Sequence, residues 1–249
     1  MRKKIIAGNW KMYKTPAEAV SLAGQIVSAP PFRSDRDVVI CPPFTALTRV
    51  ASALKGSPVR LGAQNVHWEK EGAFTGEVAA PMLKEIGCEY VIVGHSERRQ
   101  YFGENEAVVA KKLASVLGNE MKPILCVGEK LDEREGGKTE AVIEKQICGA
   151  LEQFDARSLR GLVVAYEPVW AIGTGKTATP EMAVQAHRFI RTLVGKLFGI
   201  AFAEETRIQY GGSVKAENAA ELLSEPEIDG ALVGGASLNA DSFLRIVAG

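Results

Sequence analysis

The chain has 249 residues, 46% hydrophobic and 24% charged, which is typical of a folded globular protein with a sizeable core. Its 30 basic and 30 acidic residues cancel, so the composition gives no electrostatic reason to expect nucleic acid or an anionic membrane as a partner. The four scattered cysteines form no metal-binding spacing, and no apolar stretch is long enough for a signal peptide or a membrane span, so we expect a cytoplasmic protein without a metal site.

Eight short apolar runs recur along the chain, each followed by a glycine-rich or polar corner. Because successive residues in these runs are apolar, instead of alternating with polar ones, we expect strands buried on both faces, as in a parallel sheet. The runs cover residues 4–7, 37–41, 60–63, 90–93, 122–127, 162–166, 207–210 and 230–233.

Helical patterns separate the runs. Thr15, Pro16 and Glu18 form a capping pattern before a helix that ends near residue 27, and Thr179 and Pro180 open another that ends near residue 198. Further helices are expected over residues 44–54, 81–86, 107–117, 138–154, 217–223 and 241–247.

Strand–helix units repeat over residues 1–249 without a linker or a break in composition. This pattern predicts an α/β fold, a single-domain (β/α)₈ barrel of eight parallel strands ringed by helices. A doubly wound open sheet is the alternative, but the glycine fingerprint that should follow its first strand is absent.

The carboxyl ends of the strands are where such a barrel collects its catalytic groups. Asn9 and Lys11 follow the first run, and His95 follows the fourth at the start of a short helix, whose dipole disfavours imidazolium. Glu167 follows the sixth run, where partial desolvation makes a carboxylate more basic. Each of these residues, taken alone, is also compatible with a structural role.

Paired glycines follow the last two runs, at Gly211–Gly212 before Ser213 and at Gly234–Gly235. Glycines let backbone N–H groups come close to an anion and point at it, and barrel enzymes hold phosphate at these two strand ends. We therefore expect a phosphate site here. His67, in a loop, and His187, within a helix, have no comparable position and are expected to be structural.

The stretch after Glu167 ends in Gly-Thr-Gly-Lys-Thr, which resembles the end of a nucleotide-binding P-loop. A P-loop also needs a glycine five positions before its Gly-Lys-Thr, and Trp170 stands there. An apolar segment between a proline and a pair of glycines suits a hinged lid instead. We expect that lid to comprise Pro168, Val169, Trp170, Ala171, Ile172, Gly173, Thr174, Gly175 and Lys176.

Five motifs of the chain together resemble those of the triosephosphate isomerase family. They span residues 7–12, 93–99, 165–176, 210–213 and 233–235, in the order and spacing of the family across nearly the whole chain. The resemblance implies interconversion of dihydroxyacetone phosphate and glyceraldehyde 3-phosphate through an enediol(ate), with no metal or organic cofactor. It implies Glu167 as the base, neutral His95 as the group that polarises the carbonyl, and Lys11, helped by Asn9, as the positive charge near the intermediate.

The resemblance also implies where the rest of the site lies. Glu97 would organise the site near Lys11, and the phosphate would be bound by main-chain N–H groups near Gly173, Ser213, Gly234 and Gly235. The loop after the third strand reaches a partner subunit in the family, so Phe74 and Thr75 are expected at the interface of a homodimer.

Two other functions stay open at this point. Another phosphate-binding barrel isomerase or synthase would keep both glycine pairs, but it gives no reason for a lid together with His95 and Glu167. A catalytically silent barrel that only binds a partner would be expected to have lost residues at the strand ends, and none of the key positions is lost.

Overall fold

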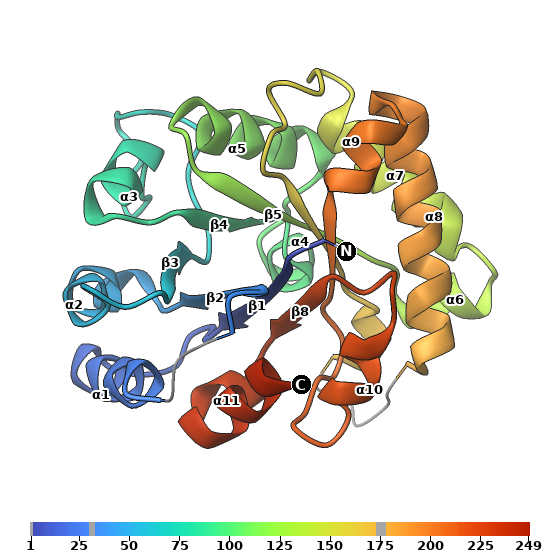
Figure 1. The fold of residues 1–249 in the computed structure, drawn as a ribbon. Helices are drawn as coiled ribbons and strands as arrows, with labels where there is room; N and C mark the ends of the chain where they lie inside the picture. Colours follow the sequence, from blue (N-terminus) through green and yellow to red (C-terminus); the bar gives the residue numbers. More distant parts are fainter. Residues whose placement is uncertain (1, 30–32, 173–177) are drawn as a thin grey trace.

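A closed barrel of eight parallel strands forms the centre of the protein, in a computed structural model that describes residues 2–29, 33–172 and 178–249 (Figure 1). The strands pair in sequence order, and β8 closes the barrel against β1. They are β1 (Lys4–Asn9), β2 (Arg36–Cys41), β3 (Arg60–Ala63), β4 (Tyr90–Val93), β5 (Lys122–Val127), β6 (Val163–Tyr166), β7 (Arg207–Tyr210) and β8 (Gly230–Val233). The predicted (β/α)₈ fold is confirmed.

Helices surround this barrel (Figure 1). The α-helices are α1 (Pro16–Val27), α2 (Leu47–Ala53), α3 (Ala80–Ile86), α4 (Ser96–Tyr101), α5 (Glu106–Gly118), α6 (Leu131–Glu135), α7 (Thr139–Leu151), α8 (Pro180–Phe198), α9 (Ile200–Glu205), α10 (Ala219–Ser224) and α11 (Ala240–Ala248). Three 3₁₀ turns, η1 (Phe44–Ala46), η2 (Val169–Ala171) and η3 (Gly235–Leu238), complete the described elements. The capping box predicted at Thr15 and Glu18 is formed, whereas α6 and α9 were not predicted. Within the described ranges, no helix is long and apolar enough to cross a membrane.

The strands bury both of their faces, as the continuous apolar runs predicted. One set of alternating residues, such as Ile5, Ile92 and Ile124, packs together in a cluster of strand residues alone, which fills the barrel. Their neighbours, such as Ile6 and Val91, join the larger cluster formed with the helices. This arrangement leaves the carboxyl ends of the strands, where the chain turns outward, to carry polar groups.

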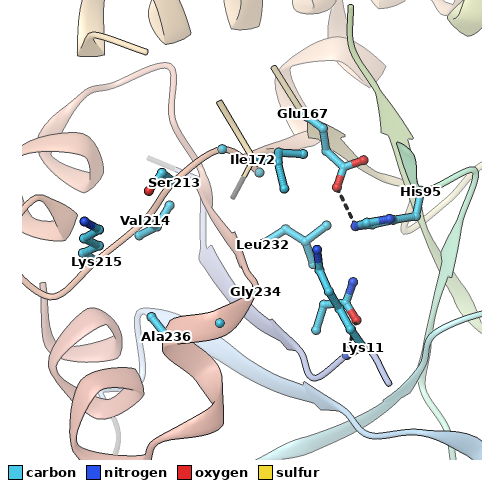
Figure 2. A pocket seen from close by; sticks show the side chains of 14 residues that line it. Lys11, His95, Glu167, Ile172, Ser213, Val214, Lys215, Leu232, Gly234 and Ala236 are labelled. Atoms are coloured by element: carbon cyan, nitrogen blue, oxygen red, sulfur yellow. Dashed lines mark hydrogen bonds and ion pairs between the residues drawn. The ribbon is translucent and has the colours of Figure 1, made fainter. Parts of the chain in front are cut away.

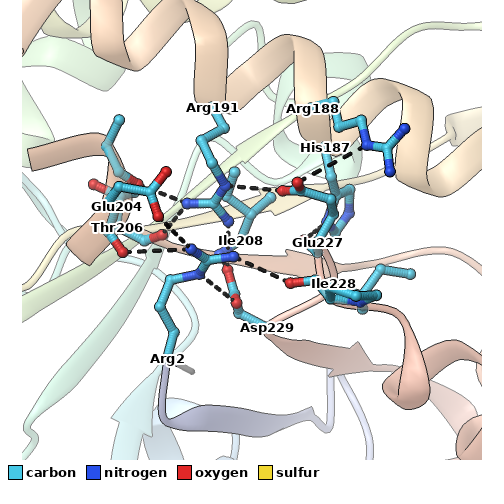
Figure 3. Close-up of polar contacts among 12 residues, drawn as sticks. Arg2, His187, Arg188, Arg191, Glu204, Thr206, Ile208, Glu227, Ile228 and Asp229 are labelled. Carbon is cyan, nitrogen blue, oxygen red and sulfur yellow. Dashed lines mark hydrogen bonds and ion pairs between the residues drawn. The ribbon is translucent and has the colours of Figure 1, made fainter. Parts of the chain in front are cut away.

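A buried charge cluster fastens the opposite end of the barrel, where the strands begin (Figure 3). Arg191 of α8 donates hydrogen bonds to Asp229 at 2.8 Å and to Glu227 at 3.0 Å, and Arg2 donates to the other Asp229 oxygen at 2.7 Å. Buried ions that satisfy one another in this way are costly to break singly. Beside them, burial lowers the pKa of His187 to about 4, which agrees with a structural role for this histidine.

Candidate active site

A pocket of about 340 Å³ opens at the carboxyl ends of the strands (Figure 2). The segments that follow β1, β4, β6, β7 and β8 all contribute to its lining, so residues far apart in sequence meet there. The predicted site residues among the lining are Asn9, Lys11, His95, Glu167, Ser213, Gly234 and Gly235. Glu97 lies next to the pocket and pairs with Lys11, and Gly173 lies outside the described residues.

Glu167 follows β6 directly and is 2% exposed. Its Oε1 lies 2.9 Å from Nε2 of His95, and its Oε2 accepts a hydrogen bond of 3.0 Å from the Ser96 amide. Burial acts to raise the pKa of this carboxyl, but His95 and the Ser96 amide outweigh burial, so the pKa is lowered. The carboxylate is therefore ionised, and both of its oxygens are engaged.

His95 caps the N-terminus of α4. Its Nδ1 accepts a hydrogen bond of 3.2 Å from the Glu97 amide, so the ring proton belongs on Nε2, which donates to Glu167. This is the hydrogen-bond pattern of a neutral imidazole. Burial acts to lower the pKa of His95, while the Glu167 carboxylate raises it above its usual value. The sequence predicted the effect of the helix end but gave no sign of this opposing one.

Lys11 sits in a strained turn after β1. Its φ of 50° lies in the left-handed region, which a lysine adopts at a cost of about 1–3 kcal/mol and keeps only where neighbours hold it. Here the Asn9 side chain accepts from the Lys11 amide at 3.0 Å, and Gln64 donates to the Lys11 carbonyl at 2.8 Å. The ammonium meets Glu97 at 2.5 Å. Such over-determined strain is typical of a functional position.

The glycine corners after β7 and β8 both line the pocket. The Ser213 carbonyl accepts a hydrogen bond of 3.1 Å from the Asn218 side chain, and the Gly234 carbonyl accepts bonds of 2.8 and 2.7 Å from the Ser237 amide and hydroxyl. At Gly212, a Cβ would lie 2.2 Å from the Tyr210 hydroxyl, so only glycine fits. These turns keep backbone close to the pocket, as an anion site requires.

Two residues after β5, Gly128 and Glu129, were not singled out from the sequence although they stand at a strand end. A Cβ on Gly128 would lie 1.8 Å from the Glu167 carbonyl oxygen. Glu129 is fully buried, accepts from the Tyr166 hydroxyl at 3.1 Å and from the Trp170 indole N–H at 3.0 Å, and pairs with Arg134. Functional residues of a barrel are expected at the carboxyl ends of its strands, and applying this expectation to the Gly-Glu pair after the fifth run would have identified both residues.

The predicted lid begins directly after β6 and Glu167. Residues 169–171 form η2, Trp170 is held by Glu129, and Ile172 lines the pocket. The predicted lid residues Gly173, Thr174, Gly175 and Lys176 lie outside the described residues. In the parts of the chain that are described, no group of three or more histidine, cysteine or acidic residues is placed to hold a metal ion.

Comparisons with known proteins agree on one family. A family model described as triosephosphate isomerase matches residues 4–249. The chain is 56% identical over 249 residues to the triosephosphate isomerase of Carboxydothermus hydrogenoformans, covering 100% of this chain and 99% of that protein. It is 54% identical over 247 residues to that of Alkaliphilus oremlandii, covering 99% of both, and 56% identical over 246 residues to that of Rhodopirellula baltica, covering 99% and 97%.

Proposed function

The chain belongs to the triosephosphate isomerase family and interconverts dihydroxyacetone phosphate and D-glyceraldehyde 3-phosphate, a step of glycolysis and gluconeogenesis, and on this basis we propose how its residues perform the reaction. One observation carries the proposal. A buried carboxylate, Glu167, and an imidazole, His95, lie 2.9 Å apart in a pocket at the carboxyl end of the barrel. A base and an electrophile in such a place suit proton transfer next to a carbonyl group.

Glu167 is the base in this proposal. It takes the proton from one substrate carbon, leaving an enediolate, and returns a proton to the neighbouring carbon. Since both carboxylate oxygens are engaged by His95 and Ser96, at least one contact has to break before the substrate can be reached. Once a partner is lost, burial raises the pKa of the carboxyl and makes it a stronger base.

His95 is the electrophile. Its Nε2–H donates to the substrate oxygens and stabilises the charge that develops on the enediolate, and the Glu97 amide keeps the proton on that nitrogen. His95 also passes a proton to the former carbonyl oxygen and takes one from the neighbouring hydroxyl, so that the carbonyl group moves to the other carbon. Lys11 adds positive charge beside the intermediate, while Asn9 and Glu97 hold its backbone and its ammonium. The reaction moves protons only, so this scheme needs no metal and no organic cofactor.

The phosphate is proposed to bind at the glycine corners, remote from the reacting carbons. Main-chain N–H groups near Ser213, Gly234 and Gly235, together with Gly173, would hold it, with Asn9 and Lys11 nearby. Binding energy gained at the phosphate can then orient the carbons against Glu167. A coupled assay of triose phosphate interconversion tests the activity itself, and a folded sample without turnover would overturn it.

The lid, residues 168–176, is proposed to close over the intermediate. An enediolate phosphate exposed to water can eliminate its phosphate, and a closed apolar cover prevents this loss. Deleting residues 169–174 should lower kcat by about 10²-fold or more, since the site can no longer be completed, and should raise the share of substrate that releases inorganic phosphate. Phosphate release per isomerisation event measures this share; unchanged partitioning would contradict the lid role.

We propose a homodimer on the side of the barrel that carries β1, β3 and β4. Five large apolar side chains are exposed after these strands, among them Met12 at 93% exposure; they are Met12, Tyr13, Phe74, Tyr101 and Phe102. Large apolar side chains gathered on one surface mark an interaction site, so we assign these five to the dimer interface. Thr75, exposed at the tip of the loop after β3, would enter the partner near its Lys11.

Replacing Thr75 with arginine should therefore dissociate the dimer and lower activity together. Light scattering after size-exclusion chromatography reports the mass, and T48R, on the exposed side of α2, is the matched control because it adds the same charge elsewhere. A T75R protein that stays dimeric at micromolar concentration would contradict this placement of the interface.

We also propose that the protein is located in the cytoplasm. The four cysteines are all free, three of them buried, as is usual for a protein of a reducing compartment. Fractionation of the cells that make the protein tests this location.

A further inference from the structure

The substrate carries nearly two negative charges on its phosphate, whereas the chain as a whole has a formal net charge of zero. Attraction toward the site therefore has to come from charges near the pocket. Among the described lining residues, three side chains carry a full charge: Lys11, Glu167 and Lys215. The reacting end holds two of them, and the third stands apart.

The charges at the reacting end offer no net attraction for a phosphate. Lys11 is paired with Glu97 at 2.5 Å, and Glu167 is an anion held by the neutral donor His95. Counted together, Lys11, Glu97 and Glu167 sum to one negative charge, which repels a phosphate dianion. The catalytic groups alone would make the pocket unattractive to the substrate that it must capture.

Lys215 is the remaining cation. It lies beyond Ser213, across the pocket from Glu167 and His95 (Figure 2). No ion pair joins it to a carboxylate in residues 2–29, 33–172 and 178–249. Its exposed ammonium is thus available to the phosphate end of an approaching substrate.

The backbone that carries Lys215 is held in place by Asn218. The Asn218 side chain accepts a hydrogen bond of 2.8 Å from the Lys215 amide and donates one of 3.1 Å to the Ser213 carbonyl. One side chain therefore fixes both the turn that borders the phosphate end and the point from which Lys215 projects. The position of this charge is set by the same turn as the predicted phosphate contact.

We propose that Lys215 is a steering residue, which attracts the phosphate dianion of the triose phosphate toward the glycine corners before the substrate is bound. This inference rests on the proposed function of the pocket and adds a residue that the sequence analysis did not assign. The attraction enters kcat/KM whether capture is irreversible or a rapid pre-equilibrium, and it leaves kcat unchanged because Lys215 touches no reacting atom.

The expected size follows from Coulomb's law. One positive charge acting on two negative charges over about 10 Å of water changes kcat/KM by about fourfold at low salt. Screening over about 10 Å at 0.1 M ionic strength reduces the effect to about twofold, and it nearly vanishes at about 0.5 M. A dependence on ionic strength therefore separates steering from direct contact.

The experiment measures kcat and kcat/KM of the native protein, K215Q, K215E and K215R from about 0.01 to about 0.5 M sodium chloride. Sulfate and phosphate buffers are avoided because these anions compete for the phosphate site. We expect K215Q to lose about two- to fourfold in kcat/KM at low salt and K215E to lose more, both converging on the native value at high salt. K215R, which keeps the charge, should behave like the native protein.

K196Q is the matched control, because it removes the same unit of charge from the last turn of α8, at the opposite end of the barrel. It should show the native salt dependence. Equal kcat/KM for the native protein, K215Q and K215E at low salt, or a loss that salt does not diminish, would overturn the inference. The native protein is assayed in the same series, and its turnover tests the proposed function separately. A native protein that is active while the Lys215 variants behave like it would overturn the steering role alone.

Discussion

Replacing Glu167 with glutamine is expected to lower kcat by about 10³-fold while the protein remains folded, because a positioned general base contributes about 10²–10⁴-fold. The amide keeps the size of the carboxylate and can still accept a hydrogen bond from the His95 Nε2–H or the Ser96 amide. The free energy of unfolding should therefore change little. The glutamine amide cannot accept a carbon-bound proton. KM should change little, since the phosphate contacts lie at other strand ends.

Replacing Glu167 with aspartate tests the position of the carboxylate separately from its ability to act as a base. The carboxylate is retained but withdrawn by one methylene, and a misplacement of about 1 Å costs about 10²-fold in rate. The H95Q variant should also lose turnover while keeping KM, because the amide can donate a hydrogen bond but cannot exchange protons with the substrate oxygens, and the glycine corners are unchanged. Steady-state kinetics in both directions measure these losses; activity that neither Glu167 variant alters would exclude Glu167 as the base.

The barrel could be predicted from the sequence because the pattern that reveals each strand lies within that strand's own residues. Most strands are apolar runs, and burial on both faces is the physical cause of that pattern. In β7 the run is interrupted by Gln209, which is buried and donates hydrogen bonds to the Ile5 and Ala231 carbonyls. The ends were harder to place: β1 extends to Asn9, since the backbone there still pairs with Cys41 of β2. The helix α6 was missed because it buries no residue and so shows no apolar face, and α9 was missed because Gly199 alone separates it from α8.

The site was predictable wherever chemistry could be assigned to one residue at one strand end. Glu167, His95, Lys11 and Asn9 were found this way, and the structure brings them together in the pocket. Residues that act only through a neighbouring segment were not found. Gln64 matters because it reaches the Lys11 carbonyl, and nothing in the order of residues reveals a contact of that kind.

Gly128 is the strongest case of a residue whose importance lies entirely in its neighbour. It follows β5, and Glu167 follows the adjacent β6, so the two backbones run side by side at the carboxyl end of the barrel. The Gln146 side chain holds the Gly128 backbone from both sides, accepting from its amide at 2.8 Å and donating to its carbonyl at 3.2 Å. A Cβ at Gly128 would meet the Glu167 carbonyl oxygen, 1.8 Å away, and moving the Gly128 backbone to relieve this clash would break its two hydrogen bonds to Gln146.

Replacing Gly128 with alanine is expected to destabilise the protein by about 3 kcal/mol, the upper range for overpacking, and to lower kcat by about 10²-fold because the backbone of the base is displaced. Urea unfolding and steady-state kinetics measure the two effects. G24A is the control: this glycine lies inside α1 with nothing within 4 Å of its Cβ position, so alanine there should stabilise by about 0.5–1 kcal/mol and leave kcat unchanged. A G128A protein as stable and active as G24A would show that the β5 end does not position Glu167, whereas failure of G128A alone to fold would be the extreme form of the expected clash.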